Sequence, residues 1–422
     1  MKSEAREKAI LVGVASRAVP RAAAEEHLDE LERLVDTAGG TVVARFVQER
    51  ASPDPATYIG KGAVENIGEA AREKAVSLVV FDDELSPAQA RNLSERWAEG
   101  VRVLDRPGVI LDVFALHART REARTQVELA QLQYLLPRLA GQYRHLSRLG
   151  GGIGGRGPGE QKLEVDRRKI RKRIARLRED LLRIEKSRTV RRRGRRGLVQ
   201  VAIAGYTNAG KTTLFNRLTR QSAYAADRLF ATLDARVARA ASRELSDTVF
   251  IDTVGFVRKL PPSLVASFRS TLAEIREADL VLHVVDASSP RAEEERGIAL
   301  EVLNELGVAR DDVLTVWTKT DLAGPRRATD GISISALTGA GMERLEAEVH
   351  RRRRPKTAQV LLTIPYSDGR AIAAARAKLR VVEEEDAGES LRMRVEAERP
   401  EIGPFLEYVE QPAGVTARRG HK

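Results

Sequence analysis

The chain of 422 residues contains no cysteine. Neither a disulfide framework nor a cysteine-ligated metal site can form, and the absence of disulfides fits a reducing compartment. The charged N-terminus leads into only a short apolar segment, so no secretory signal is predicted, and no apolar run is long enough to span a bilayer. We therefore expect a soluble, cytoplasmic protein without a membrane span.

Aromatic residues make up only 4% of the chain, whereas its formal net charge is +12. This balance argues against recognition of single strands by base stacking and favours contact with the phosphate backbone of folded RNA. Between Lys186 and Arg196, seven of eleven residues are basic and none is acidic, although such a run can also be a solvated linker. The candidate RNA-contacting residues are Arg156, Arg191, Arg192, Arg193, Arg195 and Arg196.

A phosphate-binding loop occupies residues 205–212, which read Gly-Tyr-Thr-Asn-Ala-Gly-Lys-Thr. It follows an apolar run and precedes a helix-like stretch, a context in which backbone N–H groups and a helix N-terminus face phosphates. Lys211 can reach the β- and γ-phosphates, and the Thr212 hydroxyl can ligate Mg²⁺. The residues expected to hold the nucleoside triphosphate here are Gly205, Tyr206, Thr207, Asn208, Ala209, Gly210, Lys211, Thr212 and Thr213.

Further motifs follow in the order that a GTP-binding domain needs. Asp252-Thr-Val-Gly255 ends an apolar strand, so Asp252 can hold Mg²⁺ through a water and the Gly255 N–H can meet the γ-phosphate. Phe230, Ala231 and Thr232 lie in the long connection after the first helix. Thr232 can complete the Mg²⁺ shell only while the γ-phosphate is present, which predicts a switch loop.

Recognition of the base is expected at two later strand ends. The Asp321 carboxylate can accept hydrogen bonds from N1–H and the 2-amino group of guanine, a pair that adenine cannot offer. The segment that begins at Ser335 suits a backbone contact to guanine O6. The residues expected around the base are Thr318, Lys319, Asp321, Ser335, Ala336 and Leu337.

Two positions depart from the usual pattern. Thr318 stands where the base-reading motif begins with Asn, which is expected to weaken the brace to the phosphate loop and to lower guanine affinity. Phe256 follows Gly255, where many switch GTPases place a Gln that orients the attacking water. We therefore assign no catalytic residue, and expect slow hydrolysis by the free protein with stimulation by a partner.

The alternation of apolar and amphipathic segments predicts a multidomain α/β protein. In the first unit, strands are expected at 9–14, 41–47, 77–81 and 101–104, with helices at 22–37, 62–74 and 86–97. The expected units are an N-terminal α/β domain (1–115), a long helical hairpin with a basic linker (116–196), a P-loop GTPase domain with a mixed sheet (197–355), a small C-terminal α/β domain (356–410) and a tail (411–422).

The helical hairpin is expected to be antiparallel, with helices at 120–139 and 160–186. Apolar residues in the second helix recur at spacings of 7, 4, 3, 4 and 3, which form a seam for a partner helix. Residues 150–159 between the helices are rich in glycine. This connection is either a flexible tether or a tip loop that contacts a ligand through Arg156.

The chain resembles the HflX family of ribosome-associated GTPases over nearly its whole length. The motifs that carry the resemblance lie at residues 58–62, 85–90, 103–106, 126–132, 151–160, 205–216, 229–234 and 252–256. The resemblance implies GTP and GDP as ligands and binding to the large ribosomal subunit and its ribosomal RNA.

The resemblance further implies GTP-dependent splitting of stalled or idle ribosomes, in ribosome rescue, recycling or stress response, by a protein that is a monomer off the ribosome. Two alternatives stay open. One is a GTPase that assists assembly or maturation of the large subunit. The other is a nucleotide-gated scaffold that sequesters ribosomal subunits with little turnover.

Overall fold

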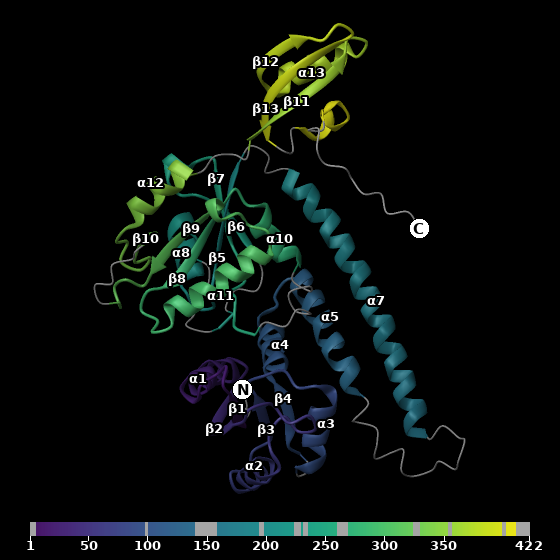
Figure 1. Cartoon of the computed structure of the whole chain (residues 1–422), viewed down its shortest axis with the longest axis vertical. Helices are drawn as coiled ribbons and strands as arrows, with labels where there is room; N and C mark the ends of the chain where they lie inside the picture. The colour runs from purple at the N-terminus through teal and green to yellow at the C-terminus, as the bar shows by residue number, and fades with distance from the viewer. Residues whose placement is uncertain are drawn as a thin grey trace.

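The computed structural model describes residues 6–97, 100–139, 158–193, 198–222, 229–230, 235–259, 269–323, 330–352, 357–398 and 402–410. Within these residues the strands form sheets of four, six and three members. Figure 1 shows one sheet in each of three successive units, with the long helix α7 (Pro158–Arg193) running beside them. The expected multidomain α/β architecture is confirmed.

The first sheet is parallel throughout and has the strand order β2-β1-β3-β4. Its strands are β1 (Glu7–Ala15), β2 (Gly40–Glu49), β3 (Leu78–Phe81) and β4 (Arg102–Asp105). The central strands are apolar on both sides because helices cover both faces of the sheet. These helices are α1 (Arg21–Thr37), α2 (Lys61–Glu73), α3 (Pro87–Arg96) and α4 (Arg106–His117).

Helix α4 was not expected from the sequence. Its residues from Val109 to Phe114 are almost all buried, so the segment lacks the polar face that marks an amphipathic helix. Asp105 caps it by accepting a hydrogen bond from the Gly108 N–H at 3.1 Å. The helix continues past residue 115, where the sequence suggested the end of the first unit.

Helices α5 (Arg121–Arg138) and α7 pack against each other. Leu129 on α5 and Ile174 and Leu177 on α7 form the buried centre of this contact. The basic stretch up to Arg193 belongs to α7, so the expectation of a linker there is corrected for residues 186–193. The predicted glycine-rich connection lies outside the described residues except for its last two positions, where α7 begins.

The second sheet is mixed and has the order β10-β9-β8-β5-β7-β6, with β6 antiparallel to β7. Its strands are β5 (Val199–Gly205), β6 (Arg236–Arg239), β7 (Thr248–Asp252), β8 (Leu280–Asp286), β9 (Val313–Thr318) and β10 (Ile332–Ser333). The helices of this unit are α8 (Lys211–Thr219), α10 (Arg269–Glu277), α11 (Ala292–Glu305) and α12 (Met342–Arg352). The parallel strands therefore end at one edge of the sheet, next to the phosphate-binding loop.

The third sheet is antiparallel, with the order β11-β13-β12. Strands β11 (Thr357–Pro365) and β13 (Ser390–Glu398) and helix α13 (Gly369–Lys378) lie within residues 356–410, where a small C-terminal α/β domain is expected from the sequence. Strand β12 (Arg380–Asp386) was not expected, because six of its seven residues are exposed and it lacks an alternating pattern.

One hydrophobic core joins the first two units. It contains Leu28 and Phe114 from the N-terminal unit together with Tyr206, Phe256 and Ile275 from the nucleotide-binding unit. The N-terminal unit is therefore packed directly onto the phosphate-binding loop and the segment that follows β7. No helix among the described residues is long and apolar enough to cross a membrane.

Candidate nucleotide-binding site

The phosphate-binding loop connects β5 to α8 at the carboxyl edge of the second sheet. Its backbone turns sharply, with φ of 61° at Asn208 and 88° at Gly210. Only glycine fits at Gly205, because a Cβ there would lie 2.2 Å from the Val284 carbonyl oxygen. A left-handed turn followed by a helix N-terminus points backbone N–H groups at one place, which suits phosphate oxygens.

Lys211 is the first residue of α8 and is only 7% exposed. Its ammonium donates a hydrogen bond to the Tyr206 carbonyl oxygen at 2.6 Å. Burial lowers the pKa of this ammonium to about 8; Asp252 opposes the shift and Lys319 adds to it. Phosphate oxygens would favour the charged form, so the loop holds this lysine where a polyphosphate would raise its pKa.

The side chains of Thr212 and Asp252 meet beside the loop. The Thr212 hydroxyl donates to Asp252 Oδ2 at 2.9 Å, and Asp252 is fully buried at the end of β7. Hydroxyl and carboxylate oxygens are the ligands that Mg²⁺ prefers, and a buried carboxylate is stabilised by a nearby cation. These two residues therefore fit a Mg²⁺ site. P-loop GTPases in general use this ion.

The predicted switch loop is described only in part. Ala231 and Thr232 lie outside the described residues. Phe230 has a positive φ of 57° and is 2% exposed. Its ring packs edge-on against Phe114 of α4, with the centroids 4.6 Å apart. The start of this loop is thus anchored to the N-terminal unit.

The segment after β7 is joined to the phosphate-binding loop by backbone hydrogen bonds. The Phe256 N–H donates to the Gly205 carbonyl at 2.9 Å, and the Thr207 N–H donates to the Phe256 carbonyl at 2.7 Å. A Cβ on Gly255 would lie 2.8 Å from the Lys211 ammonium, so glycine permits this close approach. The Phe256 side chain is 2% exposed and belongs to the shared core, and a buried phenyl ring cannot orient a water.

Thr318 braces the phosphate-binding loop. Its hydroxyl donates to the Ala209 carbonyl at 2.7 Å, and the Val285 carbonyl oxygen lies 3.1 Å away. Thr at this position therefore still contacts the loop, and the effect of the missing Asn on guanine affinity stays a prediction. The neighbouring Lys319 pairs with Asp286 at 2.7 Å.

The remaining residues expected near the base lie at the ends of β9 and β10. Asp321 is exposed, and Ser335 is 1% exposed with its hydroxyl accepting from the Thr338 N–H at 3.1 Å. Ala336 is half-buried, whereas Leu337 is 76% exposed. The loop, the Thr212–Asp252 pair and the segments that follow β9 and β10 thus lie at the carboxyl edge of one sheet.

The RNA-contact candidates fall largely outside this description. Arg156, Arg195 and Arg196 lie outside the described residues, while Arg191, Arg192 and Arg193 form the last turn of α7.

A buried ion-pair network, which the sequence reasoning missed, joins the N-terminal unit to the loop. The Tyr206 hydroxyl donates to Glu30 Oε1 of α1 at 2.7 Å and accepts from the Arg258 N–H at 2.9 Å. Arg258 also pairs with Glu30 Oε2 at 3.1 Å. Burial by itself would raise the pKa of the Glu30 carboxyl. The charges of Arg106 and Arg258 and the hydrogen bond from Tyr206 outweigh this effect and hold the pKa below its ordinary value.

Arg106, the first residue of α4, is the centre of the same network. Its guanidinium is fully buried and pairs with Glu30 at 2.9 Å and with Asp82 at 2.5 Å. Lys259 binds Asp82 at 2.6 Å and also pairs with Asp83. Sequence reasoning could have found this cluster only through Arg106, which lies in one of the motifs of the family resemblance, because its partners are far apart in the chain.

Comparison with known families agrees with this geometry. Residues 25–115 match a family described as GTP-binding GTPase N-terminal, and residues 117–195 match one described as GTP-binding GTPase middle region. Residues 200–319 match a family described as 50S ribosome-binding GTPase.

Among solved structures, a GTP-binding protein from Sulfolobus solfataricus in complex with GDP is similar over 82% of this chain and 98% of its own, at 25% identity and a TM-score of 0.43.

Curated relatives extend the similarity over the whole chain. GTPase HflX of Caldanaerobacter subterraneus subsp. tengcongensis is 42% identical over 93% of this chain and 92% of its own length. GTPase HflX of Escherichia coli K12 is 43% identical over 88% of this chain and 90% of its own length. With this coverage and the three family matches in order, the chain belongs to the HflX family and is a GTP-hydrolysing enzyme.

Proposed function

We propose that this GTPase binds the large ribosomal subunit in the cytoplasm and uses GTP to split stalled or idle ribosomes into subunits. The match of residues 200–319 to a family described as 50S ribosome-binding GTPase supports the partner. The observation that carries the splitting step is the buried attachment of Tyr206 and Arg258 to Glu30 of α1. Through this attachment, a change at the nucleotide moves the N-terminal unit relative to the ribosome.

The nucleotide would be held by the residues that the sequence motifs single out around the loop. Lys211 binds the β- and γ-phosphates, the Gly255 N–H meets the γ-phosphate, and Asp321 reads guanine. Mg²⁺ would be held by Thr212 and Thr232, with Asp252 acting through a water. When bound, this ion neutralises charge on the phosphates.

Ribosomal RNA would be contacted by the basic end of α7 and the segment after it. Of the candidates, Arg191, Arg192 and Arg193 are consecutive and close the helix. Three adjacent guanidinium groups favour a polyanion, because each phosphate contact releases counterions. Earlier in the same helix, α7 packs against α5, with Leu129, Ile174 and Leu177 buried between the two helices.

Sedimentation of purified 70S ribosomes in sucrose gradients tests the proposal. With the protein and a nonhydrolysable GTP analogue, the 70S peak is expected to convert to 30S and 50S peaks. Intact 70S particles that carry the protein would instead indicate a sequestering scaffold and reject the proposal. An assembly factor would leave 70S particles intact and bind only isolated 50S subunits or their precursors, which also rejects it.

The Asp321→Asn variant makes this test specific for the nucleotide pocket. Xanthine carries a carbonyl oxygen where guanine carries its 2-amino group. The Asn side-chain amide can donate a hydrogen bond to that oxygen, so the preference of the pocket should shift from guanine to xanthine nucleotides. The variant should lose splitting with the GTP analogue and regain it with the corresponding xanthosine analogue. If guanine preference is unchanged, the base pocket is placed wrongly even where splitting by the unaltered protein is observed.

A further inference from the structure

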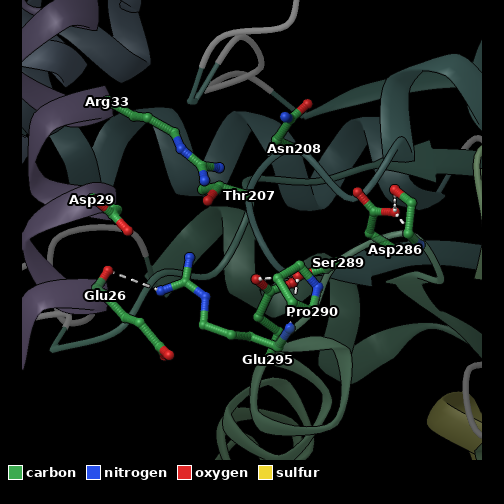
Figure 2. Close-up of a pocket in the computed structure, with 11 residues that line it drawn as sticks. Glu26, Asp29, Arg33, Thr207, Asn208, Asp286, Ser289, Pro290 and Glu295 are labelled. Atoms are coloured by element: carbon green, nitrogen blue, oxygen red, sulfur yellow. Dashed lines mark hydrogen bonds between the residues drawn. The ribbon is translucent and has the colours of Figure 1, made fainter. Parts of the chain in front are cut away.

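A cavity of about 430 Å³ lies between α1 and the phosphate-binding loop. Glu26, Asp29 and Arg33 line it from the N-terminal unit, and Thr207 and Asn208 line it from the loop. Figure 2 shows the Arg33 side chain extending from α1 into this cavity toward Thr207. The N-terminal unit therefore presents a cation at the loop that receives the phosphates of GTP.

The position of Arg33 is set by contacts on either side of the cavity. Glu30, one helical turn before Arg33, binds the Tyr206 hydroxyl at 2.7 Å. One turn earlier still, the Glu26 carbonyl accepts a hydrogen bond from Arg291 at 3.1 Å. Helix α1 is held at these two points, and Arg33 on its next turn lines the same cavity as Thr207, the residue that follows Tyr206 in the loop.

The charge of Arg33 is not used by a protein partner. Among the described residues its guanidinium forms no hydrogen bond or ion pair. Two of the acidic side chains that line the cavity are engaged elsewhere, since Asp29 pairs with Arg45 at 2.6 Å and Asp286 pairs with Lys319 at 2.7 Å.

The loop offers a matching unused group on its side of the cavity. The Thr207 hydroxyl is buried and finds no hydrogen-bond partner among the described residues. A buried hydroxyl without a partner is costly unless a ligand supplies one. The cavity thus combines an uncommitted cation with an unsatisfied polar group at the phosphate-binding turn.

We propose that Arg33 is a catalytic residue that acts in cis as an arginine finger on the transferring phosphoryl group of GTP. Negative charge spreads over the γ-phosphoryl and the β–γ bridging oxygen in the transition state, and a guanidinium can donate two hydrogen bonds to it. Because Phe256 cannot orient water, charge stabilisation by Arg33 carries a larger part of catalysis than in GTPases that have a Gln at this position. The proposal concerns hydrolysis alone and does not depend on the ribosome as partner.

The chemical step balances without a proton from Arg33. Water attacks the γ-phosphorus, and the bond between that phosphorus and the β–γ bridging oxygen breaks. GDP leaves with the electron pair, and the proton of the attacking water ends on inorganic phosphate or solvent. Arg33 keeps its protons throughout and acts only through hydrogen bonds and charge.

Replacing Arg33 in the full-length protein, without ribosomes, tests the assignment. Arg33→Ala should lower single-turnover GTP hydrolysis at least about 1,000-fold, at the low end of what arginine fingers supply. Its affinity for GDP should stay within about twofold of the unaltered protein, because ground-state binding uses the loop. Arg33→Lys should hydrolyse at an intermediate rate, because it keeps the charge but loses the planar fork.

The matched control is Arg21→Ala, at the other end of α1, where the side chain pairs with Glu25 at 3.1 Å. It should leave hydrolysis unchanged. A second readout is the tightening of GDP binding by aluminium fluoride, which should be lost in Arg33→Ala and kept in Arg21→Ala. Equal rates of hydrolysis and equal tightening of GDP binding by aluminium fluoride in Arg33→Ala and Arg21→Ala would overturn the proposal. Unchanged GDP affinity in Arg33→Ala shows that this variant is folded.

Discussion

At the scale of single residues, the candidate site depends on side chains whose burial changes their chemistry. Lys211 is the clearest case, because burial lowers the pKa of its ammonium to about 8. Thr318 is another, since its buried hydroxyl braces the loop at Ala209 with one short hydrogen bond. The sequence identifies both positions by motif, but their environments follow from neighbouring strands.

The lowered pKa of Lys211 predicts how nucleotide affinity depends on pH. In the free protein the ammonium loses its proton as pH rises through about 8, whereas bound phosphate would raise this pKa. GTP binding should therefore take up a proton between about pH 8 and 9, and affinity should fall as pH rises through that range.

Calorimetry in buffers of different ionisation enthalpy measures this proton uptake. The uptake should be small near pH 7, where Lys211 already carries its proton. Affinity that is constant from pH 7 to 9, with no buffer dependence of the heat, would contradict the assigned role of this lysine.

At the scale of elements, the attachment of α1 and α4 to the segment after β7 decides how the two units act together. Arg106 at the start of α4 is fully buried between Glu30 and Asp82, and Arg258 and Lys259 reach the same carboxylates. Because Arg258 and Lys259 follow the Asp-x-x-Gly motif, any nucleotide-dependent movement of that motif would move or break these pairs.

We expect Arg106→Ala to destabilise this attachment strongly, because it leaves two buried carboxylates without their main partner. The free energy of unfolding of the N-terminal unit should fall by about 3–5 kcal/mol. Urea unfolding together with hydrogen exchange of α1 and β3 would measure the loss. A variant with unchanged exchange in α1 would show that the network does not hold the two units together.

Arg102→Ala provides the matched control. Arg102 lies four residues away on β4, and its side chain is 63% exposed while it pairs with Glu7 at 2.5 Å. Exposed pairs contribute at most about 1 kcal/mol, so this variant should stay close to the unaltered protein in both measurements.

At the scale of the whole molecule, charge is distributed unevenly over a chain with a net charge of +12. The arginines that close α7 shortly precede the first residue of β5, whereas the phosphate-binding loop follows the last residue of that strand. This arrangement separates the proposed RNA contact from the nucleotide pocket, so the two should respond independently to mutation.

Neutralising Arg191, Arg192 and Arg193 together as glutamines should weaken binding to the large ribosomal subunit. The slope of log affinity against log salt concentration should become shallower by about 2–3, because fewer counterions are released. Affinity for GTP should not change, which serves as the internal control. Binding to ribosomes with an unchanged salt slope would exclude these residues from the RNA contact.

Much of the architecture follows from local pattern. The strands of the first sheet and the P-loop strand are predicted because parallel strands covered on both faces are continuous apolar runs. Helix α4 is missed for another reason, since most of its residues are buried and apolar and two of its exposed residues, Ala115 and Leu116, are apolar as well. Strand β12 is missed because its exposed, acidic sequence lacks the alternation of a half-buried strand.

The sequence by itself determined that the chain is a GTP-hydrolysing enzyme, because each of its nucleotide-binding motifs is a short run of residues in one loop or at one strand end. Only the tertiary structure decided what surrounds that chemistry. Glu30, Asp82, Arg106 and Arg258 are brought together from distant segments, and Arg33 faces the loop across a cavity. Such contacts depend on how two folded units pack, and no local spacing of residues encodes them.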